Sequence, residues 1–358
     1  EEMRENQIAN KEKPKYDGCC RNKALKEGVI RFLNPSDGSV VFDDFVKGEV
    51  SISNFELDDL VISRSDGSPT YNLTVVVDDH DMEIDCVIRG DDHINNTPKQ
   101  INLYKAMGWP LPDFAHVPMI LGTDGSRLSK RHGALNLLSY RDEGFLPEAL
   151  LNYIVRLGWS SGDQEIFSVK EMIDLFELKN INNSPASFNQ EKLEWINQSY
   201  IKSTDINNLV KNLKWHLNNL NINLDNGPNI NDLADSLRER SGSLVDMANS
   251  CAMFYCDFDT FDSVQANKAF NTKSKSILED LVSNLNSVDS WTADNIHSVI
   301  KSICDEREVG FGKVGQPFRL ALSGDGRSGS IDISAQFVGK KRTLARLKKA
   351  IDWIENHS

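Results

Sequence analysis

Two short apolar segments, each followed at once by polar residues, constrain the fold of this chain more than any other feature. Residues 73–77 (LTVVV) and 86–88 (CVI) have the length of buried parallel strands, and the first is β-branched. Asp78 and Asp79 follow the first segment, and residues 89–93 (RGDDH) follow the second. Ligands of open α/β sheets bind outside the carboxyl ends of the strands, so these polar clusters mark a candidate site.

A helix is predicted directly after the second polar cluster. Thr97 is its expected N-cap and Pro98 its first residue, while Gln100 is expected to close a capping box. Gly108 is the expected stop. The order strand, polar loop, strand, polar loop, helix therefore predicts an α/β sheet in this part of the chain.

The regions on either side have different patterns. Before residue 70, turn signals separate short apolar runs that predict strands, at 29–32, 40–42, 50–52 and 60–62. From Pro147 the pattern is helical, and the first helix is expected to end at Gly158. Further helices are expected beyond about residue 200, interrupted by a glycine-rich turn at 310–317 and ending in a helix from about Lys340, whose apolar stripe comprises Leu344, Leu347, Ile351 and Ile354.

Size and composition indicate an ordinary globular protein of two or three domains. The chain has 358 residues, of which 39% are hydrophobic and 26% charged. No stretch approaches the ~20 apolar residues of a membrane span, and six scattered cysteines do not make a disulfide framework. We therefore expect a cytoplasmic protein. Because the chain begins Glu1-Glu2 without Met or a signal peptide, we also expect it to be a fragment.

The net charge of −13 argues against non-specific binding of nucleic acid. Local clusters of cations weaken that objection, because a polyanion needs only a basic track. One cluster comprises Arg127, Lys130, Arg131 and His132, and another comprises Lys340, Lys341, Arg342, Arg346, Lys348 and Lys349. Each cluster taken alone is equally compatible with a solvated surface.

The most informative segment is residues 122–133 (GTDGSRLSKRHG). Small residues lead into a run of cations around one hydroxyl group, so such a loop can close over a polyphosphate. Lys130 would act as a compact positive charge and Ser129 as a hydrogen-bond partner. By itself the short cationic run is a weak signal.

Further segments give this loop a specific context. TYN at 70–72, VVDD at 76–79, VIRGDDHINNTP at 87–98, LSKRHG at 128–133, PEALLNY at 147–153 and LGW at 157–159 occur in this order. From about Tyr16 to its end, the chain resembles the bacterial glutamyl-tRNA synthetases, with residues 127–131 (RLSKR) similar to the Lys-Met-Ser-Lys-Ser signature of class I aminoacyl-tRNA synthetases.

The resemblance implies activation of L-glutamate by ATP and transfer of the glutamyl group to tRNA(Glu). It implies that Lys130, Ser129, Arg127 and Arg131 form the catalytic loop, and that Lys130, Asp92, Met119 and Ile120 bind ATP, which enters with Mg²⁺. It also implies that Tyr71 and Arg89 bind the glutamate. A guanidinium group suits a carboxylate, although an ion pair of Arg89 with Asp91 or Asp92 is the simpler structural alternative. Val75 stands where some relatives place an Asn, so no contact is predicted there.

The implied fold is multidomain, α/β followed by all-α. It comprises part of an inserted acceptor-binding domain (1–70), the second half of a Rossmann-like catalytic domain (71–109), a stem-contact region with the cationic loop (110–203), and a helical anticodon-binding domain (204–358) with a break near 295–310. The His-Ile-Gly-His-type signature of the family is absent from the sequence, so we expect little or no activity from this chain alone. A monomer without membrane contacts is expected.

Zinc is not expected, although some relatives bind it through Cys-x-Cys and Cys-x-His pairs. Cys20 matches the later cysteine, but Asn22 stands where the histidine would be. Two other functions stay open: glutaminyl-tRNA synthetase-like specificity, and a tRNA-binding module without catalysis.

Overall fold

The computed structural model describes residues 2–11, 15–23, 25, 27–128 and 136–357. The chain divides into two compact units, of which the first comprises Glu1–Ala134 with Asn152–Asn189 and the second Leu135–Leu151 with Gln190–Ser358. Within the described ranges, none of the helices combines the length and the apolar character that crossing a bilayer requires.

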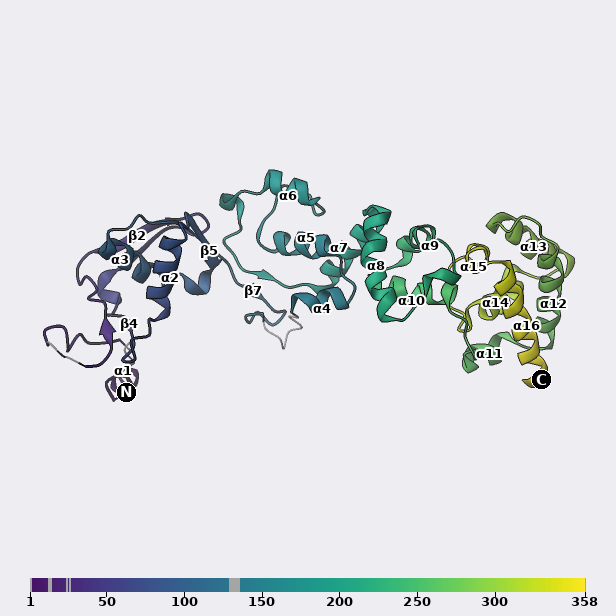
Figure 1. Cartoon of the computed structure of the whole chain (residues 1–358), viewed down its shortest axis with the longest axis horizontal. Coiled ribbons are helices and arrows are strands. Elements are labelled where there is room, and N and C mark those ends of the chain that lie inside the picture. The colour runs from purple at the N-terminus through teal and green to yellow at the C-terminus, as the bar shows by residue number, and fades with distance from the viewer. Residues whose placement is uncertain (1, 12–14, 24, 26, 129–135, 358) are drawn as a thin grey trace. The chain divides into compact units, whose positions relative to one another are not determined.

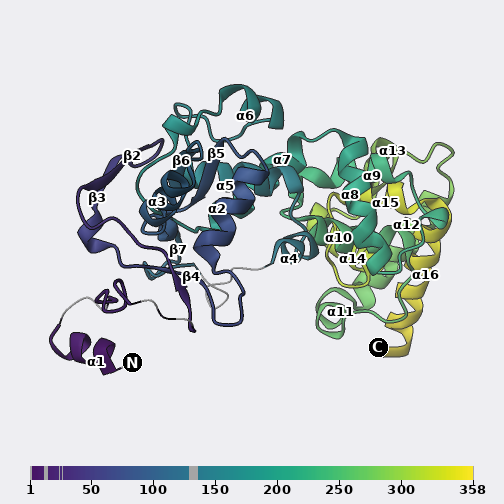
Figure 2. The same ribbon diagram turned by 60° about the vertical axis from the view of Figure 1, so that its left-hand side comes forward.

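The first unit contains a four-stranded mixed sheet, whose strands are labelled in Figure 2. Its order is β3 (Gly48–Ser53), β2 (Ser39–Asp44), β6 (Asp113–Val117) and β5 (Cys86–Gly90). The hairpin β2–β3 is antiparallel, whereas β2–β6 and β6–β5 are parallel pairs. Val40, Phe42 and Phe114 alternate inward on these strands and pack with Ile101 in one buried cluster.

One predicted strand is wrong. Residues 73–77 belong to the helix α2 (Tyr71–Asp81), which packs against α3 (Thr97–Met107). The buried side chain of Val76 joins Leu103 and Tyr104 in a second apolar cluster. The β-branched run favoured a strand, but β-propensity is a weak preference that packing overrides. The sheet therefore has no strand at this position within the described residues.

The helix α3 ends as predicted and begins differently. Gly108, with a φ of 70°, is the left-handed C-cap, and Pro98 lies in the first turn. Asn96 rather than Thr97 is the N-cap, and no side-chain cap forms. The side chains of Thr97 and Gln100 instead accept hydrogen bonds from Arg89, so the expected capping box is absent.

The remaining elements of the first unit are short. The predicted strands at 29–32 and 60–62 are the antiparallel pair β1 (Ile30–Arg31) and β4 (Val61–Ser63). A parallel pair joins β7 (Ile120–Leu121) to β8 (Ala186–Ser187). The other helices that begin or end in this unit are α1 (Glu2–Ala9), α5 (Pro147–Gly158) and α6 (Val169–Leu175).

The second unit is helical in the part of the chain that the structure describes. Its helices are α4 (Leu137–Asp142), α7 (Gln190–Ser203), α8 (Ile206–Asn219), α9 (Ile230–Leu237), α10 (Leu244–Tyr255), α11 (Ser263–Ala269), α12 (Thr272–Asn286), α13 (Ala293–Glu306), α14 (Phe311–Ser323), α15 (Ile331–Val338) and α16 (Lys340–His357). The helices α8, α9 and α10 pack together, and α12 to α16 form a second group (Figure 1).

One sequence prediction for this unit differs from the structure. Residues 310–317, predicted as a turn, lie mostly in α14. A Cβ atom at Gly315 would lie 3.0 Å from Ile331 of α15, so the glycine permits close packing of two helices. The predicted break near 295–310 coincides with α13, which packs against α12, α14 and α15. The same range includes the connection from α13 to α14, and the break stays a prediction.

Candidate active site

Arg89 is the centre of a polar cluster on the parallel strands. It faces His116 in register on the neighbouring strand, so both side chains lie on one face of the sheet. The Arg89 Nε donates to His116 Nε2 at 3.1 Å. Its Nη2 donates to Thr97 Oγ1 at 2.7 Å and to Gln100 Oε1 at 2.8 Å. Thr97 and Gln100 are one helical turn apart on α3, which brings both oxygens to the same side.

No ion pair of Arg89 is found among the residues that the structure describes. Asp91 pairs instead with Lys47 at 3.0 Å, and Asp92 with Arg127 at 3.1 Å. The ion pair that we considered as the structural alternative for Arg89 is therefore not formed. Burial lowers the pKa of the Arg89 guanidinium, while the neighbouring Tyr71 and Asp79 favour its charged form.

His116 and Asp44 form a buried pair beneath Arg89. His116 is 0% exposed and Asp44 4%. The His116 Nδ1 lies 2.6 Å from Asp44 Oδ2, and its Nε2 receives the Arg89 Nε–H. Because a guanidinium only donates, and the Thr97 hydroxyl 2.9 Å from Nε2 can donate as well, these contacts favour the neutral imidazole with its proton on Nδ1. Burial lowers the pKa of His116, and the hydrogen bond with Asp44 only partly opposes that effect.

Asp44 is stabilised as a carboxylate in this buried position. Its Oδ1 accepts the backbone N–H groups of Val46 and Lys47, both at 2.9 Å, and the backbone N–H of His116 reaches both of its oxygens. Burial alone would raise the pKa of Asp44, but the hydrogen bonds from His116 and from the backbone lower it on balance.

The predicted glutamate ligand Tyr71 lies beside this cluster. It is the first residue of α2 and is 50% exposed. Its hydroxyl group lies 3.2 Å from His93 Nδ1. Tyr71 also favours the charged form of Arg89 through a side-chain hydrogen bond, so the structure brings Tyr71 and Arg89 together.

The predicted ATP ligands in the described part of the chain also lie close to one another. A Cβ atom at Gly90 would lie 2.7 Å from Asp92 Oδ1 and 3.8 Å from Met119 Sδ. Arg127 reaches Asp92, and Leu128 N donates to Ile120 O at 2.9 Å, which joins β7 to the start of the cationic loop. Met119 and Ile120 line an apolar pocket of about 230 Å³ together with Trp159.

The rest of the predicted catalytic loop lies outside the described residues. Ser129, Lys130 and Arg131 are therefore not placed, and their roles stay a prediction. Among the described residues, no group of three or more His, Cys, Asp or Glu side chains could hold a metal ion. The Sγ atoms of Cys19 and Cys20 lie 3.6 Å apart.

Sequence reasoning missed Asp44, His116, Gln100 and Lys47 as members of the site. The sequence separation between Asp44 and His116 is 72 residues, and strand pairing alone brings them together. One signal was present: residues 113–117 (DFAHV) place a single histidine in an apolar strand. A buried histidine requires polar partners, which could have directed attention to it.

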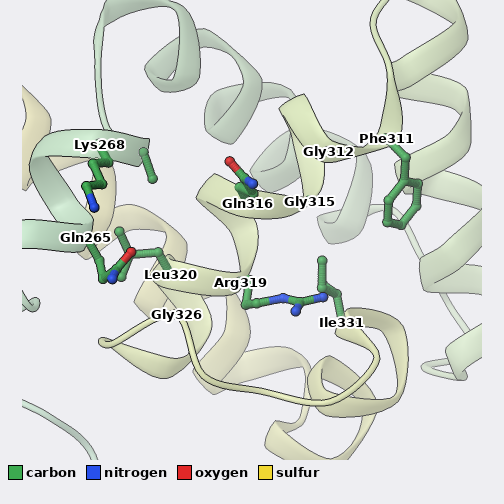
Figure 3. Close-up of a pocket in the computed structure, with 11 residues that line it drawn as sticks. Gln265, Lys268, Phe311, Gly312, Gly315, Gln316, Arg319, Leu320, Gly326 and Ile331 are labelled. Carbon is green, nitrogen blue, oxygen red and sulfur yellow. The ribbon is translucent and has the colours of Figure 1, made fainter.

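The helical unit contains a separate polar pocket of about 470 Å³. Figure 3 shows Arg319 of α14 extending toward Ile331, with Lys268 and Gln265 of α11 in another part of the lining. Two cations and two amide side chains, Gln265 and Gln316, line this pocket. Such a set suits a ligand that carries both negative charge and hydrogen-bonding groups.

The C-terminal cluster of cations is partly used for internal contacts. Arg346, which is not part of the predicted apolar stripe, is 4% exposed and donates to three backbone carbonyl groups. Arg342 pairs with Asp257 at 3.0 Å, and Lys340 donates to the backbone oxygens of Asn286 and Val288. The cluster therefore offers fewer free charges than its sequence indicates.

Comparisons with known proteins agree with these observations. Residues 1–195 match the family model of class I tRNA synthetases (E and Q), catalytic domain, and residues 208–351 match an anticodon binding domain. The chain is 61% identical over 351 residues to a glutamate–tRNA ligase of Vesicomyosocius okutanii, covering 98% of this chain and 77% of the relative. It is 61% identical over 350 residues to the corresponding ligase of Ruthia magnifica, with the same coverage.

A solved structure leads to the same family. The crystal structure of a glutamate tRNA ligase from Elizabethkingia meningosepticum, in complex with its amino acid, superposes with a TM-score of 0.83 at 30% identity, covering 99% of this chain and 77% of that one. Family model, sequence relatives and fold thus coincide over nearly the whole length of the chain. The chain belongs to the class I tRNA synthetases for glutamate and glutamine, and within them to the glutamate–tRNA ligases.

Proposed function

We propose that this chain carries the glutamate-recognition site, part of the ATP site and the anticodon-binding region of a ligase that joins glutamate to tRNA(Glu). In the first step a glutamate oxygen attacks the α-phosphate of ATP, giving glutamyl-adenylate and pyrophosphate. In the second, a hydroxyl group of the terminal ribose of tRNA displaces AMP. The identity of 61% to two glutamate–tRNA ligases supports the overall reaction, and the contacts of Arg89 support the choice of amino acid.

The contacts of Arg89 suit an anionic substrate. His116, Thr97 and Gln100 occupy three of its N–H groups, and all three acceptors are neutral. This set leaves Nη1 without one of these three acceptors, with the Tyr71 hydroxyl as a further hydrogen-bonding neighbour of the guanidinium, and among the described residues it leaves the positive charge without a directly paired carboxylate. A carboxylate satisfies both, whereas the neutral amide of glutamine would leave the charge uncompensated. Sites of this kind can discriminate by roughly 10⁴–10⁵.

The ATP-binding part of the proposal rests on the residues around Gly90. Met119 and Ile120 would hold the adenine, and Asp92 with its partner Arg127 lies beside them. Mg²⁺ would enter with ATP, bound mainly by the phosphates. Ser129, Lys130 and Arg131 would follow on the same loop. Lys130 would stabilise the negative charge that develops on the leaving pyrophosphate.

The helical unit would bind the anticodon part of tRNA(Glu). Its match to an anticodon binding domain supports this assignment, and the pocket with Lys268 and Arg319 offers charge for phosphate and hydrogen bonds for bases. We further propose that the protein acts in the cytoplasm as a monomer.

The test is aminoacylation by the complete gene product, with glutamate and glutamine as competing substrates. We expect glutamate to be charged preferentially. Arg89→Lys keeps the positive charge but loses the planar pair of N–H donors of the guanidinium. It should lower kcat/KM for glutamate by roughly 10²-fold. Arg64→Lys is the matched control, because Arg64 is an exposed arginine of the same unit outside the site.

Each alternative predicts a different result. Preferential charging of glutamine would establish glutaminyl specificity. Binding of tRNA without any charging would establish a binding module. An Arg89→Lys variant as active as Arg64→Lys would remove Arg89 from the site.

A further inference from the structure

We propose that Asp44 and His116 are positioning residues that fix the guanidinium group of Arg89 in the orientation that receives the substrate carboxylate. This inference rests on the proposed role of Arg89 in glutamate binding. Neither residue needs to touch the substrate. Both would act through the hydrogen bond between His116 Nε2 and Arg89 Nε.

His116 Nε2 faces two groups, the Arg89 Nε–H at 3.1 Å and the Thr97 hydroxyl at 2.9 Å. His116 is fully buried at 0% exposure, so bulk water does not reach its ring. If Nε2 carried a proton, two donors would face each other at 3.1 Å. The guanidinium would then have to rotate away from His116, and its contacts with Thr97 and Gln100 would change with it.

Asp44 selects the tautomer of His116. Its Oδ2 lies 2.6 Å from His116 Nδ1, which holds the proton on that nitrogen. The other carboxylate oxygen accepts the backbone N–H groups of Val46 and Lys47. Because these two groups come from the turn after β2, the orientation of Asp44 is fixed by the main chain and does not depend on Arg89.

The imidazole of His116 also keeps the negative charge of Asp44 away from Arg89. A carboxylate in direct contact with Arg89 would compete with the carboxylate of the substrate. The imidazole separates the two: it presents a neutral acceptor to Arg89, while Asp44 lies on its far side. The arrangement therefore orients the guanidinium and leaves its charge for the ligand. It would contribute to the preference for glutamate over glutamine as well as to affinity.

The substitution Asp44→Asn in the complete gene product provides an isosteric test. The amide oxygen should take the place of Oδ1, which accepts two backbone N–H groups, and the NH₂ group should then face His116 Nδ1. His116 would accept at Nδ1 and carry its proton on Nε2, opposite Arg89. Selective ¹⁵N labelling of histidine reports the tautomer directly by NMR.

We expect Asp44→Asn to raise KM for glutamate about tenfold to hundredfold, which corresponds to one lost charge-assisted hydrogen bond. The values of kcat and of KM for ATP should change less than about threefold, and the preference for glutamate over glutamine should fall. Asp43→Asn is the matched control, since Asp43 is an exposed neighbour on the same strand.

A pair of His116 variants tests the same contact independently and decides the question if Asp44→Asn does not fold. Glutamine places an amide oxygen where Nε2 lies, so His116→Gln can still accept from Arg89. Asparagine places its amide group where Nδ1 lies, so His116→Asn keeps the contact with Asp44 and loses the one with Arg89. KM for glutamate should rise more in His116→Asn than in His116→Gln. The packing loss is also larger in His116→Asn.

Two results would overturn the inference. One is an inverted tautomer in Asp44→Asn with an unchanged KM for glutamate. The other is equal KM values in the two His116 variants. If Arg89→Lys raises KM while these variants do not, only the positioning role fails. If Arg89→Lys itself has no effect, the proposed glutamate site fails.

Discussion

Arg346 shows how far the environment of one residue can depart from its sequence pattern. The side chain belongs to a basic C-terminal helix, yet its Nη1 donates to Leu322 O at 2.6 Å. Its Nη2 donates to Met253 O, to Cys256 O and to the Asp257 carboxylate. Burial lowers the pKa of Arg346, with Asp257 opposing that effect. The arginine closes the ends of neighbouring helices by satisfying their last carbonyl groups.

Replacement of this arginine by an apolar residue of similar length should therefore destabilise the fold. We expect Arg346→Met to lower the free energy of unfolding by about 2–4 kcal/mol, because several buried carbonyl groups lose their donor. Lys348→Met, at an exposed position of the same helix, should change it by less than about 0.5 kcal/mol. Urea unfolding followed by circular dichroism compares the two. Equal effects would mean that the contacts of Arg346 contribute no net stability.

Local sequence segments decide which residues of the candidate site could be predicted. Tyr71, Arg89 and Asp92 lie in segments whose order along the chain matches a known family, and the structure places them near one another. Asp44 and His116 carry no such local signature. Their role depends on the register of β2, β6 and β5, which the amino-acid pattern does not specify.

At the scale of elements, α2 is an example of a segment whose conformation is determined by packing and not by local sequence. Gly108 and Gly158 mark helix ends correctly, since a stop signal is local. Residues 40–42 and 50–52 form strands because their alternation matches a sheet with one buried face. Residues 73–77 have no such alternation, and their conformation is decided by the contact between α2 and α3. A local pattern could not supply that information.

The helical state of this segment has a testable consequence. Thr74 is exposed on α2, where alanine has the higher helix propensity, so Thr74→Ala should raise the free energy of unfolding by about 0.5 kcal/mol. In a strand the same substitution would lower it. Val76→Ala at the fully buried position should cost about 1.5–3 kcal/mol and serves as the reference. Thermal unfolding measures both; a destabilised Thr74→Ala variant would contradict the helix.

For the whole molecule, the main question is how a chain of net charge −13 binds a polyanion. The C-terminal cations are partly committed to Asp257 and to backbone carbonyl groups. The pocket between α11 and α14 still presents Lys268 and Arg319. Binding of tRNA should then depend on a few well-placed cations, with the rest of the surface repelling the ligand.

For the binding of tRNA(Glu), the position of the cations should matter more than the total charge of the protein. The double variant Lys268→Gln/Arg319→Gln should weaken binding of tRNA(Glu) and reduce the slope of log Kd against log salt by about 1–2. The variant Lys341→Gln/Lys348→Gln changes the net charge equally at exposed positions of α16. It should leave both quantities nearly unchanged. If the two variants behave alike in a filter-binding salt series, the pocket is not a specific tRNA contact.

The mixed sheet has a consequence for how the parts of this enzyme can be exchanged. The boundary that we predicted at residue 70 is crossed by that sheet, because β2 and β3 precede it while β5 and β6 follow it. Asp44, at the end of β2, belongs to the preceding part, and Arg89 to the following part. Under the positioning role proposed for Asp44, a chimera that took the first 70 residues from a relative would need a carboxylate at position 44 to keep the orientation of Arg89. A cut at residue 70 would therefore separate Asp44 from His116 and Arg89, which strand pairing brings together.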